Sequence, residues 1–254
     1  CKLIDLDYGI CHLGIIPLRK ENSHKSEMVS QLLYGDAFKL IEKRKCWDKI
    51  RLDWDGYEGW VNHNQVFKIS KESFDKITSS EMKVSNDLVN YISTQENLLF
   101  PILIGSDLRC LKTLRHQFEG ESKKPKKLKK ELTSTAYLFL NAPYLWGGRT
   151  ILGIDCSGFT QMIYKINGIK LSRDANQQAL EGQTLSFIEE SEAGDLAFFD
   201  DADGNITHVG VLLENHYIIH AYSNVRIDRI DQHGIFNLET QTHTHKLRFI
   251  KKMI

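Results

Sequence analysis

The residues best suited to chemistry in this sequence are one cysteine and two histidines in its C-terminal half. Cys156 stands in "LGIDCSGFTQMIY", between an acid and a serine and just before apolar residues at helical spacing. The unpaired N–H groups at the start of a helix stabilise a thiolate, which is the nucleophilic form of cysteine. Cys156 is therefore either a nucleophile or, like many single cysteines, a small buried apolar residue.

His208 and His220 could supply the base that such a nucleophile needs. If "THVGVLLENHYIIHAY" forms a hairpin centred on Glu214, position 208 lies opposite position 220. Directly opposed residues hold their Cβ atoms about 4.5–5.5 Å apart, so one imidazole can orient the other. A base and the group that orients it complete a cysteine nucleophile.

The remaining histidines have no comparable partner. The alternation of His243 and His245 in "THTH" is only a weak metal signal, and we expect no metal site. We expect the following histidines to face solvent: His12, His24, His63, His116, His216, His233, His243 and His245.

Helix and strand patterns place the cysteine and the two histidines in one α+β domain. Apolar spacing predicts a helix over about 128–139 and a central helix of about twelve residues from Cys156 to Gly168. Strands are predicted at 195–200, 207–214, 216–222 and 246–251. A helix-rich half followed by a strand-rich half is typical of an α+β domain.

The N-terminal half reads as short strands separated by turns. The predicted strands are Ala37–Glu42, Trp47–Leu52 and Tyr57–Asn62, which suggest a small barrel. In the segment 70–122 the apolar residues recur with neither a clear helical nor a clear strand period. We assign this segment to a second, mainly β module. The lysine-rich stretch "SKKPKKLKK" favours a solvated linker over a patch that binds polyanions. We therefore expect three domains: 1–69, 70–125 and 126–254.

Composition excludes several classes of partner and compartment. Lys plus Arg and Asp plus Glu each number 33, so no charge bias favours nucleic acid. No apolar run reaches the roughly 18 residues of a membrane span. The five cysteines form no CxxC pair, which favours reduced thiols and a cytoplasmic protein.

Cys1 at the first position would fit a processed lipoprotein in the cell envelope. No lipobox is visible, so removal of an initiating Met or trimming of the chain is the favoured origin of Cys1.

Six short blocks resemble, in order, the NlpC-type cell-wall cysteine peptidases. The blocks are "YLWGG" at 144–148, "GIDCSGF" at 153–159, "SRDANQQ" at 172–178, "GDLAFF" at 194–199, "ITHVGVLL" at 206–213 and "IIHAY" at 218–222. The resemblance implies a permuted papain-like domain, preceded here by one or two small β-barrel modules. It also implies that Cys156 is the nucleophile, His208 the general base and later acid, and His220 the residue that orients His208. No metal or organic cofactor is implied.

The N-terminal half narrows the resemblance to one subgroup. "SEMVSQLLYGDAF" and "DGYEGWV" are similar to the bacterial Src-homology-like modules of γ-D-glutamyl-L-diamino acid endopeptidases. Such enzymes cut murein peptides with a free N-terminal L-Ala, between γ-D-Glu and the diamino acid, through a thioester. The first module then closes the groove, and Glu27 and Tyr57 are candidates to bind the substrate amine. Glu27 could equally be an ordinary surface acid.

The resemblance also suggests residues that bind the rest of the substrate. Asp155 and Ser157 would hold its backbone and the D-Glu carboxylate, and Arg173 and Asp174 would line the same pocket. The alternatives are a helix cap for Asp155 and a surface ion pair between Arg173 and Asp174. Ala175 departs from many relatives, which have serine there, so one hydroxyl contact to substrate is lost or supplied elsewhere.

Two aromatic residues complete the predicted site. Tyr144 would help the Cys156 backbone N–H stabilise an oxyanion, or would simply pack with Trp146.

Two other functions stay open at this point. One is a wall-binding protein whose third domain is catalytically silent, and the other is a thiol amidase or acyltransferase on the same fold. We expect a monomer. The sequence leaves open the preferred diamino acid, the cellular compartment and the role of the middle module.

Overall fold

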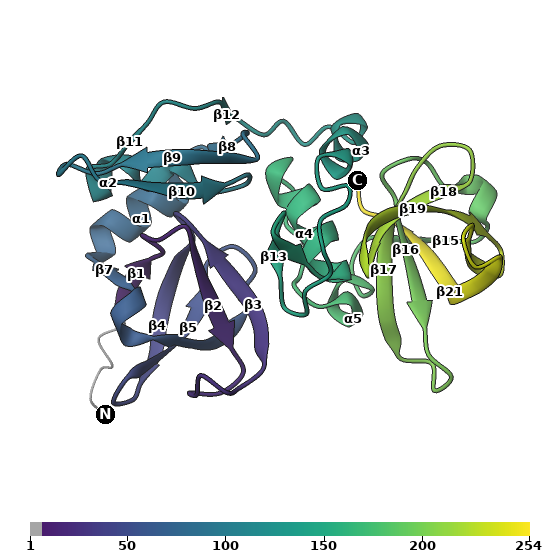
Figure 1. The fold of residues 1–254 in the computed structure, drawn as a ribbon, viewed down its shortest axis with the longest axis horizontal. Coiled ribbons are helices and arrows are strands. Elements are labelled where there is room, and N and C mark those ends of the chain that lie inside the picture. Colours follow the sequence, from purple (N-terminus) through teal and green to yellow (C-terminus); the bar gives the residue numbers. More distant parts are fainter. Residues whose placement is uncertain (1–6) are drawn as a thin grey trace. The chain divides into compact units, whose positions relative to one another are not determined.

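The chain divides into two units, Cys1–Pro125 and Lys126–Ile254, each with its own hydrophobic core (Figure 1). The structure is a computed structural model that describes residues 7–254. Cys1 and its proposed origins therefore lie outside the described residues. The predicted three-way division of the chain stays a prediction.

A seven-stranded antiparallel sheet forms the first part of the N-terminal unit. Its order is β3-β2-β6-β5-β4-β1-β7. The strands are β1 (Tyr8–Ile10), β2 (Ile15–Arg19), β3 (Met28–Leu33), β4 (Ala37–Lys43), β5 (Trp47–Leu52), β6 (Glu58–Asn62) and β7 (Phe67–Ile69), with a 3-10 turn η1 (His63–Gln65) before β7. The three strands predicted over 37–62 are confirmed as β4, β5 and β6.

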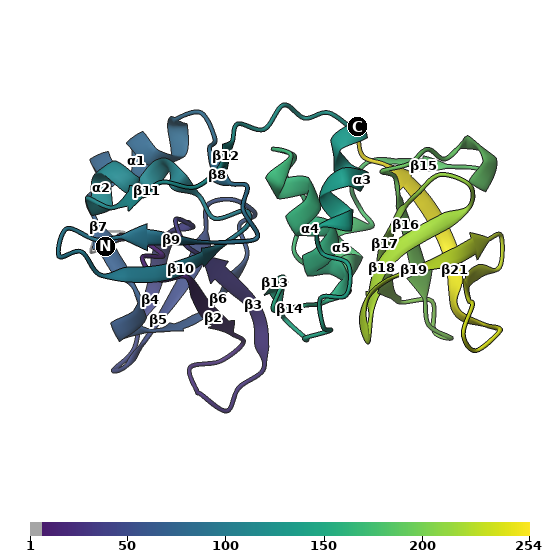
Figure 2. The same cartoon turned by 45° about the horizontal axis from the view of Figure 1, so that its top comes forward.

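The second part of this unit shares a core with the first. Ile10 and Tyr34 pack in one cluster with Ile77, Ile92 and Ile102. In Figures 1 and 2, α1, α2 and the β9–β10 hairpin gather on one side of the larger sheet. The elements are α1 (Lys71–Ser79), β8 (Val84–Ser85), β9 (Val89–Ser93), β10 (Leu99–Leu103), η2 (Leu108–Cys110), α2 (Leu111–Leu114), β11 (Gln117–Phe118) and β12 (Ser122–Lys123).

A six-stranded barrel with three helices forms the C-terminal unit. The sheet order is β15-β21-β16-β17-β18-β19-β20, and β20 also pairs with β21, which closes the barrel. The six barrel strands are β16 (Leu196–Asp200), β17 (Ile206–Leu212), β18 (Tyr217–Tyr222), β19 (Asn224–Asp231), β20 (Gly234–Asn237) and β21 (Thr242–Lys252), and β15 (Gln183–Leu185) pairs with β21 outside the closed ring. The remaining elements are α3 (Lys130–Tyr137), β13 (Arg149–Thr150), β14 (Gly153–Ile154), α4 (Cys156–Ile166), α5 (Ala175–Gln178) and η3 (Ile188–Glu190). The four predicted strands are confirmed as β16, β17, β18 and β21, whereas β19 and β20 were not foreseen.

The central helix α4 is buried along its whole length. Its apolar residues Phe159 and Ile163 are inaccessible to solvent, as the helical spacing predicts. Phe159 meets Phe139, which follows α3, edge to face at 6.0 Å between ring centroids. The other face of α4 packs on β17 and β18. The barrel and α3 thus hold α4 from two sides and fix the position of its first residue.

No helix within residues 7–254 combines the length and apolar character needed to cross a membrane.

Candidate active site

Cys156 is the first residue of α4 and is almost completely buried, with 7% of its surface exposed. Asp155 is the N-cap, since its Oδ1 accepts a hydrogen bond of 2.6 Å from the Gly158 N–H. Gly158 allows this close packing, because a Cβ there would lie 2.2 Å from the Gly148 carbonyl oxygen. The Cys156 sulfur lies beside the backbone of Val209 in β17, which can donate a hydrogen bond to the thiolate.

The residue next to Val209 is His208, and it contacts His220 across the hairpin. His208 Nε2 and His220 Nδ1 lie 2.9 Å apart, and both side chains are buried. The predicted register is wrong by two residues, because His220 lies directly opposite Gly210 and not His208. Asn215 and His216 both have positive φ in the turn and centre the hairpin on Asn215. A register shift of two residues keeps every side chain on the same face of the sheet. The two histidines therefore still meet, but as diagonal neighbours and not as directly opposed residues.

Gly210 leaves the space that this diagonal contact uses. A Cβ at position 210 would lie 2.9 Å from the Cβ of His220. A larger side chain at this position would therefore require His220 to move, together with Ile218, whose Cδ1 would lie 2.7 Å from the added Cβ.

Asp228 and Arg226 extend the pair into a row across three neighbouring strands. The Asp228 Oδ2 lies 3.1 Å from His220 Nε2 and accepts a hydrogen bond of 2.7 Å from Arg226 Nε. Burial raises the pKa of Asp228, but the hydrogen bonds from His220 and Arg226 outweigh it, and the net pKa is lowered. Asp228 is therefore an ionised, fully buried partner of His220. Sequence reasoning missed it because β19 was not predicted.

His245 also belongs to this cluster, although it was expected to face solvent. Its ring stacks on His208 with 4.1 Å between centroids and 27° between planes, and it meets Tyr222 edge to face at 4.9 Å. A β-bulge explains the difference: Phe236 pairs with His243 but Ile235 pairs with His245, so Thr244 is an extra residue. His243 and His245 consequently point to opposite faces of β21. The expectation that His245 faces solvent is wrong.

Burial sets the charge states in the site. It raises the pKa of the Cys156 thiol to about 12, and the Asp155 carboxylate adds to this, while hydrogen bonds from Val209 and Ser157 oppose it. Burial also lowers the pKa of His208 far below its usual value, helped by the neighbouring rings of His220 and His245. Both shifts favour the neutral forms, a thiol at Cys156 and an uncharged imidazole at His208. Desolvation thus outweighs the helix N-terminus, which the sequence had suggested would stabilise a thiolate.

Three of the four predicted substrate-pocket residues form one buried polar cluster next to Cys156. Arg173 donates to Asp155 Oδ2 at 2.6 Å and to Ser157 Oγ at 3.0 Å. Arg173 is only 1% exposed, so its guanidinium is fixed. Its ion-pair partner is Asp155. Asp174 instead caps α5, where its backbone N–H donates to the Gln177 side chain.

The two predicted aromatic residues lie on the loop before β13. Burial raises the pKa of Tyr144, and the charges of Cys156 and Asp155 raise it further, so its phenol lies near both groups. Trp146 is 62% exposed. Tyr144 is therefore close enough to Cys156 for their charges to interact, whereas Trp146 exposes most of its side chain to solvent.

Glu27 and Tyr57 belong to the N-terminal unit. Glu27 Oε2 lies 3.3 Å from Lys20 Nζ in an exposed pair. Tyr57 packs against the core of the seven-stranded sheet and follows a turn capped by Asp55. Their proposed contact with a substrate amine stays a prediction.

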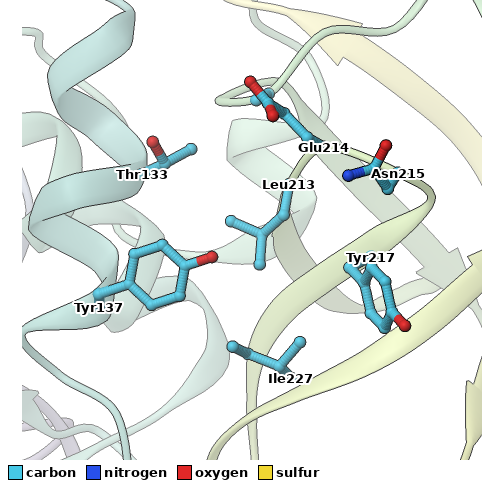
Figure 3. Close-up of a pocket in the computed structure, with 8 residues that line it drawn as sticks. Thr133, Tyr137, Leu213, Glu214, Asn215, Tyr217 and Ile227 are labelled. Atoms are coloured by element: carbon cyan, nitrogen blue, oxygen red, sulfur yellow. The ribbon is translucent and has the colours of Figure 1, made fainter.

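The described cavities of the C-terminal unit lie around the tip of the β17–β18 hairpin. One, of about 450 Å³, opens between α3 and the hairpin and is lined by Thr133, Tyr137, Leu213 and Tyr217 among others (Figure 3). None of these cavities includes Cys156, His208 or His220 in its lining. They are therefore separate from the thiol and its histidines.

Comparisons with known proteins match both units. Residues 141–244 match the NlpC/P60 family, and residues 18–66 match the family described as bacterial dipeptidyl-peptidase Sh3 domain. A dipeptidyl-peptidase 6 of Lysinibacillus sphaericus is 31% identical, over 85% of this chain and 90% of that protein. A gamma-D-glutamyl-L-lysine dipeptidyl-peptidase of Bacillus subtilis (strain 168) is 29% identical, over 76% of this chain and 71% of that protein.

A solved structure shows the same fold. The crystal structure of an NlpC/P60 family protein from Bacillus cereus ATCC 10987 superimposes with a TM-score of 0.77 at 18% identity, covering 97% of this chain and 99% of that one. The predicted fold, a papain-like domain preceded by a small β domain, is confirmed.

Proposed function

Because this chain belongs to the NlpC/P60 family and is a cysteine peptidase that acts on peptidoglycan peptides, we propose that it hydrolyses the bond between γ-D-Glu and the diamino acid. The observation that carries this proposal is the row of Asp228, His220 and His208, which leads to Val209, the residue whose backbone lies beside the buried thiol of Cys156. The names of the matched relatives support the choice of bond, since two of them are gamma-D-glutamyl-L-lysine dipeptidyl-peptidases.

The row of hydrogen bonds determines where the protons lie. Ionised Asp228 can only accept, so His220 donates from Nε2 and its Nδ1 carries a lone pair. His208 then donates from Nε2 to His220 Nδ1, which leaves its own Nδ1 as the base. In this tautomer His208 can take the proton of the Cys156 thiol.

Catalysis begins when the substrate carbonyl reaches the sulfur. His208 removes the thiol proton as the bond between the sulfur and the substrate carbon forms. A thiolate–imidazolium ion pair therefore need not exist before the attack. The oxyanion would be stabilised by the backbone N–H of Cys156 and the phenol of Tyr144. Protonated His208 then gives its proton to the leaving amine, and a thioester remains. Water, activated by the same imidazole, hydrolyses the thioester and regenerates the thiol.

The buried cluster next to the thiol supports recognition of a carboxylate. Arg173 has guanidinium donors that suit the D-Glu α-carboxylate, although Asp155 already neutralises part of its charge. Ser157 adds a hydroxyl at the same point. We propose that Glu27 and Tyr57 of the N-terminal unit bind the free amine of L-Ala, which would restrict cleavage to peptides with an unblocked N-terminus.

Product analysis by mass spectrometry tests the proposal. The purified chain would be incubated with L-Ala-γ-D-Glu-meso-diaminopimelate, its Lys counterpart, an N-acetylated form and intact murein. Cys156→Ala should abolish turnover, whereas Cys46→Ala should not, because Cys46 is an exposed thiol in the other unit. Release of L-Ala-γ-D-Glu from free-amine peptides alone would support both the bond and the amine site.

Other product patterns would overturn parts of the proposal. Cleavage of the blocked peptide would refute the roles of Glu27 and Tyr57 but keep the γ-D-glutamyl bond. Cleavage of a different amide would favour an amidase or acyltransferase. Binding of all substrates without any cleavage would favour a wall-binding protein.

A further inference from the structure

Asp231, His233 and His243 come together where β19 turns into β20 and β21 passes beside the turn. Their donor atoms all lie within 4.8 Å of one another. His243 Nε2 is 3.0 Å from Asp231 Oδ2, and His233 Nδ1 is 3.6 Å from Asp231 Oδ1. We propose that these three side chains form a binding site for a divalent transition-metal ion of the zinc type.

The donor set selects this class of ion. Two imidazole nitrogens and one carboxylate suit Zn²⁺, Co²⁺, Ni²⁺ or Cu²⁺, whereas Ca²⁺ and Mg²⁺ prefer oxygen ligands alone. Bonds of about 2.0–2.2 Å in a tetrahedral complex separate neighbouring ligand atoms by roughly 3.3–3.6 Å. The separations around Asp231 are close to that range, so small side-chain rotations would accommodate an ion.

The fold holds Asp231 in place before any ion binds. Asp231 Oδ1 accepts hydrogen bonds from the backbone N–H groups of His233 and Gly234, at 2.8 and 3.1 Å. The bulge at Thr244 places His243 on the Asp231 side of β21 while His245 turns toward His208. This explains why the "THTH" pattern misleads: its two histidines cannot share one ion, but His243 can share one with residues of the neighbouring turn.

The site opens onto a cavity of about 600 Å³ that is also lined by Glu189, His216 and Arg229. Water or a further ligand can therefore reach the remaining coordination positions. Within residues 7–254, this is the one group of three histidine, cysteine or acidic side chains whose donor atoms lie so close together. An ion here would join the end of β19, the turn and β21, and so would stabilise the folded barrel.

Metal titration of the full chain tests the proposal. Cys156→Ala would be the background, because it removes the catalytic thiol as a competing ligand. The protein, first stripped with a chelator, would be titrated with Zn²⁺ by calorimetry and with Co²⁺ by visible absorption. We expect one saturable ion per chain, and a Tm higher by about 5 °C or more at a hundredfold excess over Kd.

Matched variants locate the ion. In the same background, His243→Ala and the near-isosteric Asp231→Asn should each weaken binding about tenfold or more. His63→Ala is the control, because His63 pairs with Asp48 at 2.8 Å in the other unit and should leave the affinity unchanged. The proposal is overturned if Co²⁺ does not bind, if both site variants bind like the background, or if only His208→Ala abolishes binding.

Discussion

Replacing Asp228 by asparagine would test the proton positions on which the proposed mechanism depends. Asparagine keeps the shape of the side chain but removes the charge that holds the proton on His220 Nε2. Its amide can donate to that nitrogen, which would move the proton to His220 Nδ1. His208 would then have to accept at Nε2 and carry its proton on Nδ1, where the base is needed.

The expected fall in kcat/KM of Asp228→Asn follows from the free energy of the lost hydrogen bond to His220. Asp228 is fully buried, so water cannot replace the carboxylate. A hydrogen bond to a charged group contributes about 1.5–3 kcal/mol, and each 1.36 kcal/mol corresponds to about tenfold in rate. We therefore expect kcat/KM to fall about 10- to 150-fold, with most of the loss in kcat, because Asp228 contacts His220 and is placed to orient it.

The assay is steady-state cleavage of L-Ala-γ-D-Glu-diamino acid from pH 5 to 9, with Tm recorded for each variant. Glu239→Gln is the control: Glu239 bonds Arg226 at 3.2 Å with 75% of its side chain exposed, and such a pair contributes little. The kcat/KM of Glu239→Gln should stay within about twofold of that of the parent protein, because an exposed ion pair contributes little. A folded Asp228→Asn protein with the parent's kcat/KM would refute the assigned tautomers.

Three further predictions concern the same site. Gly210→Ala should lower kcat about tenfold or more with a smaller effect on KM, because its Cβ would displace His220; unchanged kinetics would contradict the close contact. The rate of Cys156 alkylation by iodoacetamide should rise about tenfold per pH unit from pH 7 to 9, because burial raises the pKa of the thiol; a plateau near pH 7 would instead indicate a thiolate–imidazolium pair with His208. Ala175→Ser should leave kcat/KM within about tenfold, the value of one hydrogen bond, and a larger change in steady-state kinetics would refute this.

Local sequence patterns predicted much of the fold around the thiol. The spacing of Phe159 and Ile163 marked the central helix, and alternation in β17 and β18 marked the hairpin. These signals work because burial of one face is a short-range property of the chain. The helix α1 was missed, although Ser70 caps it by accepting from the Ser73 N–H, because its nine residues carry few apolar side chains.

Contacts between strands distant in the sequence were harder to foresee. The faces of His208 and His220 were predicted correctly because alternation has a period of two, but their register depended on the left-handed residues Asn215 and His216. Asp228 lies on a strand, NVRIDRID, in which charged residues outnumber apolar ones, so its composition resembles an exposed edge. His245 turns inward only because of an extra residue at Thr244, which no local pattern reveals.

The proposed catalytic row runs diagonally across β17, β18 and β19, because His220 lies opposite Gly210 and Arg226 and not opposite His208 and Asp228. Its spacing is therefore set by the distance between adjacent strands, about 4.8 Å, and by the register in which these strands pair. Loops at either end of the barrel can change in length during evolution while the relay keeps its dimensions, provided that the strands keep their pairing. A designer could accordingly replace the exposed turn at 202–204, between β16 and β17, with a longer recognition loop while leaving the pairing of β17, β18 and β19 intact.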